Sequence, residues 1–261
     1  IRDRLRVGMP SGPVDASTLA NRTVTNATFE GPFDLATDYL ISGDNLLAVE
    51  VHQVNSTSSD VVFALRLAAT VSTTDPGAAS ALAVLDGLRV TELMYHPEED
   101  PDLEFIELKN VGGETLDLTG VRLEGGVEFT FPAMTLGPGE YVVVVRDLAE
   151  FQARYGADVS VAGEYSGNLS DGGEQLILRS AAPYDAAALR FHYDDAWYPE
   201  TDGNGYALVV NDASAPPRAW DQAFGWTAGS VEGGTPGAPD ASWVSGIVIN
   251  EVLSHTDPPL Y

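Results

Sequence analysis

The stretch LRVTELMYHPEEDPDLEFIELKN, Leu88–Asn110, consists of two short apolar runs on either side of an acidic, proline-containing loop. Short runs of apolar and β-branched residues bounded by Pro, Gly, Asn or Asp are typical of β-strands. The same pattern recurs along most of the chain, so the sequence predicts an all-β protein. Further runs of this kind are Asn45–Val54, Val61–Leu67, Val127–Phe131, Tyr141–Val145, Glu174–Leu178 and Tyr206–Val210.

Two of these features predict more than a strand. Tyr141–Val145 (YVVVV) is apolar at every position, which predicts a central strand or one covered on both faces. One short helix is expected after Asp147, because Asp147 and Glu150 form a capping pattern and Gly156 can end the helix. We expect this helix to lie across the end of a sheet.

Composition limits the classes of partner. The 261 residues are 44% hydrophobic, enough for a buried core, and they carry a net charge of −26 from 39 acidic and 13 basic residues. Nucleic acid is excluded as an expected partner, because its binding depends on Lys and Arg neutralising phosphates. No run of about 18 apolar residues is present, so membrane insertion is not expected. The absence of cysteine excludes thiol chemistry and Cys-ligated metals.

Two stretches rich in small residues, Gly and Pro are predicted to be linkers, since they lack the periodicity of a strand. They lie at Val71–Gly87 and Ala213–Gly246, and the second contains GGTPGAPD at Gly233–Asp240. The expected organisation is a first β unit at 1–72, a linker at 73–87, a second β unit at 88–212, a linker at 213–246 and a final segment at 247–261.

The final segment repeats the beginning of the second β unit. Arg89–His96 (RVTELMYH) aligns with Val248–His255 (VINEVLSH), so that Glu92 matches Glu251 and the apolar positions correspond. Ile247–Tyr261 is therefore predicted to be the first strand of a second copy. This favours a chain that is a segment of a longer polypeptide. The alternative is a filament in which incomplete units complete one another by β-strand addition.

From Leu88 onward the chain resembles bacterial lamin tail domains. The resemblance implies an immunoglobulin-like β-sandwich without catalytic residues. The segments that carry it are Leu88–Asn110, Leu116–Pro132, Leu136–Gly156, Tyr165–Ser180, Phe191–Asp212 and the trailing GGTPGAPD.

The first 72 residues resemble a different family. Val7–Val14 and Leu40–Leu67 are similar to the C-terminal half of a jelly-roll of the galactose-binding-like type, and the strands that open such a domain are missing. The expected fold is therefore all-β, with one lamin tail domain, one short helix and a partial jelly-roll.

An acidic loop supplies the candidate metal ligands. Its carboxylates would suit calcium, which prefers six to eight oxygen ligands from flexible loops; the alternative is a solvated acidic loop. The candidate ligands are Glu98, Glu99, Asp100, Asp102 and Glu104.

Aromatic and acidic residues supply the other candidate sites. Trp220, Trp226 and Trp243 would stack on sugars if exposed, and would otherwise pin loops against the sandwich. Glu92 and Glu107 lie on strands expected to be neighbours, where paired carboxylates suit acid–base chemistry; the alternative is a solvated surface.

The function expected from these observations is that of a non-catalytic structural, adhesive or spacer module in a large secreted or cell-surface bacterial protein. Its partners would be neighbouring domains or like subunits. The alternatives are a carbohydrate-binding accessory module that binds extracellular glycans and a filament subunit.

Overall fold

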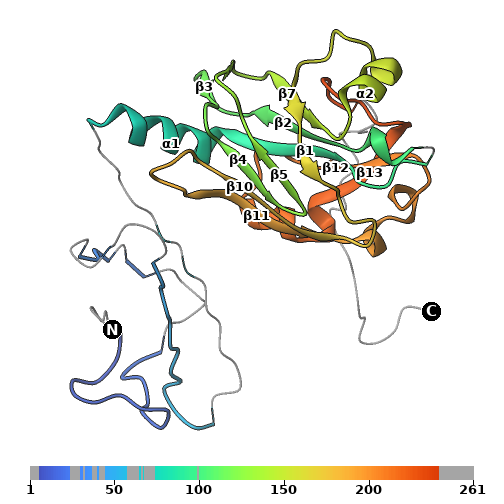
Figure 1. Ribbon diagram of the computed structural model, residues 1–261. Helices are drawn as coiled ribbons and strands as arrows, with labels where there is room; N and C mark the ends of the chain where they lie inside the picture. Colours follow the sequence, from blue (N-terminus) through green and yellow to red (C-terminus); the bar gives the residue numbers. More distant parts are fainter. Residues whose placement is uncertain are drawn as a thin grey trace, which may run out of the picture. The chain divides into compact units, whose positions relative to one another are not determined.

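The computed structural model describes residues 6–23, 30–31, 33–36, 40, 45–57, 65, 67, 74–98 and 100–240. The chain forms two units, Ile1–Thr73 and Thr74–Tyr261. The second unit contains the regular secondary structure of the described residues, and it is a β-sandwich (Figure 1).

One layer of the sandwich is a six-stranded sheet, in which β7 and β8 are parallel and the other neighbours are antiparallel. In spatial order its strands are β13 (Trp226–Glu232), β12 (Tyr206–Val210), β1 (Leu88–Met94), β2 (Phe105–Asn110), β7 (Tyr141–Val145) and β8 (Val161–Glu164).

The other layer is a five-stranded sheet. Its strands in spatial order are β11 (Ala187–Tyr193), β10 (Glu174–Arg179), β4 (Arg122–Gly125), β5 (Val127–Thr130) and β9 (Ser166–Gly167). A short pair, β3 (Leu116–Asp117) and β6 (Thr135–Leu136), forms a third sheet. Five 3₁₀ turns complete the described part of this unit: η3 (Pro101–Leu103), η4 (Asp195–Trp197), η5 (Pro199–Thr201), η6 (Pro217–Asp221) and η7 (Ala223–Gly225).

The main core lies between the two large sheets. It includes Val90 and Leu108 from one sheet and Leu176 and Phe191 from the other, all buried. A second core covers the outer face of the six-stranded sheet, where Phe105 and Val143 pack against Phe151 of helix α2 (Leu148–Tyr155). Both faces of the six-stranded sheet are therefore apolar over much of their area. Strand β7, Tyr141–Val145, lies within this sheet and is covered on both faces, as its sequence predicts.

Helix α2 forms as its capping residues predict. The Asp147 carboxylate accepts hydrogen bonds from the backbone N–H groups of Ala149 and Glu150, and Gly156 ends the helix at φ 89°. The helix packs through Phe151 on the outer face of the six-stranded sheet, in a cluster with residues at one end of β1, β2 and β7 (Met94, Phe105 and Val145).

A second helix corrects the prediction of a linker at 73–87. Helix α1 (Pro76–Gly87) begins at the N-cap Asp75 and buries Val84 in the main core. A Pro in the first turn and an Ala-rich sequence favour a helix, and this preference outweighs the small-residue composition that suggested a loop. The described part of the chain therefore has two helices where the sequence predicted one.

The segment predicted as a linker at 213–246 also belongs to the sandwich over its described part. It supplies the edge strand β13 and two 3₁₀ turns, η6 and η7. Trp220 and Trp226 anchor it in the main core. Residues 241–261, including the strand predicted at Ile247–Tyr261, lie outside the described residues.

The described residues of the first unit form no helix or strand, although Asn45–Val54 was predicted to be a strand. Leu46 is 94% exposed, and Leu47, Val49 and Val51 are each about half exposed. Alternating apolar side chains stabilise a strand when a second layer buries them, and the described residues supply no such layer. The jelly-roll resemblance is thus unsupported, and most of Val61–Leu67 lies outside the described residues.

Candidate functional site

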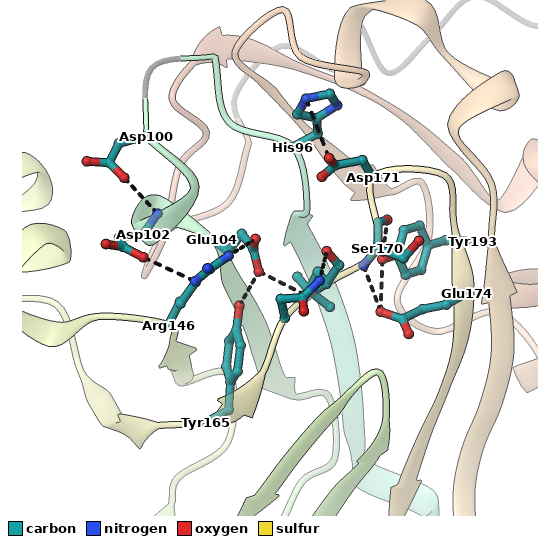
Figure 2. Close-up of polar contacts among 12 residues, drawn as sticks. His96, Asp100, Asp102, Glu104, Arg146, Tyr165, Ser170, Asp171, Glu174 and Tyr193 are labelled. Atoms are coloured by element: carbon teal, nitrogen blue, oxygen red, sulfur yellow. Dashed lines mark hydrogen bonds and ion pairs between the residues drawn. The ribbon is translucent and has the colours of Figure 1, made fainter.

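The acidic loop lies at one end of the sandwich, where the structure uses its carboxylates as local hydrogen-bond acceptors (Figure 2). Asp100 caps the turn η3 by accepting a hydrogen bond from the backbone N–H of Asp102 at 2.9 Å. Asp102 pairs with Arg146, with 3.1 Å between Oδ1 and Nε. Glu98 is exposed, and Glu99 lies outside the described residues.

Glu104 is the buried centre of this region, with 2% of its surface exposed. Its carboxylate accepts from Arg146 Nη1 at 2.6 Å, from the Tyr165 hydroxyl at 2.8 Å and from the Leu169 backbone N–H at 2.8 Å (Figure 2). Burial raises the pKa of Glu104 above its ordinary value, although these donors act in the opposite direction. Glu104 therefore joins three separate segments of the domain.

The four candidate ligands that the structure describes do not form a calcium site with one another. No group of three or more His, Asp or Glu residues within the described ranges is placed to hold a metal ion. Asp102 and Glu104 face Arg146, a cation, and Asp100 is engaged by its own turn. Asp100, Asp102 and Glu104 therefore serve capping and ion pairing, which a count of carboxylates in the sequence does not distinguish from metal ligation.

His96 lies beside this loop and contacts two acids from other loops. Its Nδ1 is 2.8 Å from Asp202 Oδ1, and its Nε2 is 4.0 Å from Asp171 Oδ2. In Figure 2, Asp171 and Ser170 occupy the same turn, next to Glu174, which accepts from the Ser170 backbone N–H at 2.9 Å. Through these contacts His96 links its own loop to the loops of Asp202 and Asp171.

The tryptophans predicted to bind sugars are buried where the structure describes them. Trp220 and Trp226 are each 0% exposed, and their indole N–H groups donate to Val90 O and Trp220 O, both at 2.8 Å. A ring without exposed surface cannot stack on a glycan, so these two residues pin the segment after β12 to the core. Trp243 lies outside the described residues.

The most unusual polar feature is the pair Glu92 and Glu107 on the outer face of the six-stranded sheet. The register of β1 and β2 places them directly opposite each other, next to a bulge between Val90 and Glu92. Each is 2% exposed. The prediction of a solvated acidic surface was wrong, because a later part of the chain covers this face.

The cover is the segment Gly233–Gly237, which we call the strap. Its backbone N–H groups at Thr235 and Gly237 donate to Glu92 Oε1 at 2.9 Å and to Glu107 Oε2 at 2.7 Å. Beneath the strap, Thr91 Oγ1 donates to Glu107 Oε1 at 2.6 Å. The strap therefore caps each carboxylate separately.

A cavity of about 130 Å³ lies beside the pair. Its lining includes Lys109, Tyr141 and Asp240 as well as the two glutamates. Lys109 donates to the Tyr141 hydroxyl at 2.8 Å. The space is large enough for a few water molecules.

Burial controls the protonation of the pair. It is the largest cause that raises the pKa of Glu92 to about 8, followed by the neighbouring charge of Glu107. Burial likewise raises the pKa of Glu107 to about 7, against the opposing effects of Thr91, the Gly237 N–H and Lys109. Two coupled carboxyls with such values exchange protons with solvent near neutral pH. Chemically, the pair can store and release protons.

One sequence signal marks this site, although it predicts a different structure. The glycines of GGTPG predict a linker, yet Gly233, Gly234 and Gly237 have φ of 89°, 78° and 86°, and so form the turns of the strap. A Cβ at Gly234 would lie 2.3 Å from Glu92 Oε1, so the close approach also requires glycine.

Comparison with known proteins identifies part of the sandwich. Residues 83–192 match the Lamin Tail Domain family, from within α1 to within β11. The resemblance to lamin tail domains is confirmed for this region, which is an immunoglobulin-like β-sandwich. The strap and both buried tryptophans follow the matched region. A search of curated proteins gives no match. Among the described residues, no helix has the length and apolar character needed to cross a membrane.

Proposed function

We propose that the sandwich is a non-catalytic spacer module of a secreted or cell-surface bacterial protein. In this function it holds neighbouring parts of the polypeptide, or like subunits, at fixed positions. The observation that carries the proposal is that the segments entering and leaving the sandwich are both fastened to its body.

The entering segment is fastened through α1. Asp75 caps the helix and accepts a hydrogen bond from the Tyr184 hydroxyl, which belongs to the loop between β10 and β11. The residue after α1, Leu88, is the first residue of β1, so the helix continues into the sheet without a loop. Val84 adds an apolar anchor in the main core. A segment held in this way transmits its orientation to the sheet.

The leaving segment is fastened through the strap and Asp240. Besides the two bonds to the glutamates, the Gly233 carbonyl accepts from the Tyr155 hydroxyl of α2 at 2.7 Å. Farther along, Asp240 accepts from the Ser230 backbone N–H at 2.8 Å and from its hydroxyl at 2.6 Å. These contacts hold residues 233–240 against the outer face of the six-stranded sheet.

The experiment measures the fixation of both segments. The chain has no cysteine, so spin labels at Ala79→Cys on α1 and Ala238→Cys after the strap need no prior substitutions. Double electron–electron resonance at pH 6 should give a single narrow distance distribution. A control pair, Ala79→Cys with Gln152→Cys on α2, sets the width for two helices of one rigid body. A much broader distribution for the first pair would contradict the spacer proposal.

Two alternatives remain as proposals with their own tests. Binding to a glycan array would favour a carbohydrate-binding module, and concentration-dependent polymerisation would favour a filament subunit. Turnover of a polysaccharide would contradict a non-catalytic function. The jelly-roll interpretation of residues 1–72 is a proposal too, and it rests on the sequence pattern alone, with its apolar alternation at Leu47, Val49 and Val51.

A further inference from the structure

The strap covers Glu92 and Glu107, two carboxyls whose ionisation would be unfavourable while they stay buried. Gly234 lies so close to the sheet that a Cβ there would also lie 3.2 Å from Phe105 and Ala207. The strap thus covers the two carboxyls on the side away from the main core, beside the cavity that they line. Its removal would hydrate Glu92 and Glu107 without disturbing the core between the sheets.

We propose that the strap is a proton-controlled latch, closed over the sheet while Glu92 and Glu107 retain protons and open when both carboxylates are ionised. The inference deepens the proposed spacer function, on which it rests, because the strap fastens the leaving segment. Proton loss would then free the strap from the two carboxylates, while Asp240 stays bound to Ser230 and α1 stays in place.

Linkage gives the direction of the effect. In the closed state the pKa values of the two carboxyls are raised to about 8 and about 7, whereas hydrated carboxyls would return toward the ordinary value of 4.5. The open state therefore binds fewer protons, so rising pH favours opening. The strap N–H groups oppose this by stabilising the charged forms, but the effect of burial is larger for both residues.

The surrounding charges do not neutralise the ionised pair. Lys109 of β2 favours ionisation of Glu107, while Asp240 disfavours ionisation of Glu92. The other titratable groups nearby are Tyr141 of β7, Tyr155 and Arg154 of α2, and Glu98 and Glu232 beside Gly233. Two new negative charges near Asp240 would have Lys109 as the cation that acts on Glu107, and this excess of negative charge favours access of water.

Electron paramagnetic resonance of the full chain tests the latch. A nitroxide at Ala238→Cys should be immobile at pH 6. Its ratio of mobile to immobile signal should rise at least about tenfold by pH 9, because a pKa difference of one unit between the closed and open states changes their equilibrium constant tenfold. The double substitution Glu92→Gln and Glu107→Gln removes the titrating groups but keeps oxygens for the strap N–H groups. In that variant the label should stay immobile throughout.

Controls separate latch opening from general effects. Glu128→Gln changes an exposed carboxylate on β5 and should leave the pH response of the label unaltered. A label at Gln152→Cys on α2 and the near-ultraviolet circular dichroism of the buried Trp220 and Trp226 should not change between pH 6 and pH 9. If the double variant does not fold, Glu107→Gln alone should reduce the response at least severalfold.

Three results would overturn the latch. They are an unchanged label in the native sequence, the same response in the glutamine variant, and mobility that appears together with loss of the tryptophan signal. The spacer proposal is tested at one pH by a distance, and the latch by a change with pH. A narrow distance at pH 6 with no response to pH would therefore reject the latch alone.

Discussion

Replacing Glu104 by alanine should destabilise the sandwich. Calcium should not change the stability of the native sequence. The substitution removes the acceptor for two buried donors, the Tyr165 hydroxyl and the Leu169 N–H, and one of the two carboxylate partners of Arg146. A buried donor left without a partner costs about 1–3 kcal/mol. Arg146 keeps its ion pair with Asp102, so the two buried donors dominate the loss.

The free energy of unfolding should fall by about 3 kcal/mol. This is less than the sum of the highest costs for two unpaired donors, because the substitution also removes the desolvation penalty of the buried carboxylate. For a unit of this size that corresponds to a fall in Tm of roughly 6–12 °C. Thermal unfolding followed by circular dichroism measures it. Glu98→Ala, an exposed residue of the same loop, is the matched control and should change stability by less than about 0.5 kcal/mol.

The effect of calcium distinguishes a structural role of Glu104, in which it joins segments of the domain, from a role as a calcium ligand. If Glu104 joins segments of the domain, millimolar calcium should leave the Tm of the native sequence unchanged. If Glu104 were a ligand, calcium would raise the Tm of the native sequence and not that of the variant. That result, or a loss below about 1 kcal/mol on substitution, would refute the argument from buried donors.

Three further predictions concern the sheet and its anchors. As pH rises from 4.5 through about 7, the contribution of Glu107 alone should lower the unfolding free energy by about 3 kcal/mol, because its raised pKa means that the folded state binds an extra proton. Denaturant titrations at several pH values measure this, and the Glu92→Gln, Glu107→Gln variant should lack this dependence on pH. Trp220→Phe should cost about 2 kcal/mol in the same assay and change no glycan binding, because the ring is buried and its N–H serves Val90 O. Val84→Ala in α1 should cost about 2 kcal/mol, against less than about 0.5 kcal/mol for the exposed Asp86→Asn.

Local signals in the sequence were sufficient for most of the sandwich. The predicted strand at Tyr206–Val210 has the bounds of β12, and that at Glu174–Leu178 ends one residue before β10. Helix α2 followed from Asp147 and Gly156, because capping depends on residues within one turn. The family resemblance gave the layer arrangement that alternation alone does not specify.

The roles of single side chains were harder to predict, because the exposure of a side chain depends on residues that are distant in the sequence. The late tryptophans look like a binding surface when their loops are read alone. In the fold, Trp220 reaches Val90, 130 residues earlier in the chain, and becomes a core residue. The same holds for Glu104, whose partners Tyr165 and Leu169 are 61 and 65 residues away. The local sequence around Glu104 is the same whether the residue is a metal ligand or joins distant segments of the domain.

The strap shows why composition was misleading at the carboxylate pair. Glycine weakens strands and favours turns, so GGTPG reads as a linker from its own residues. The property that makes glycine a poor strand former also lets the backbone approach a carboxylate where any Cβ would collide, as at Gly234. Whether such a segment is a linker or a cover depends on Glu92 and Glu107, which lie 143 and 130 residues before the strap residues they bind. Once the cover is known, the two acids of the solvated-surface alternative become two buried carboxyls, and burial raises the pKa of both.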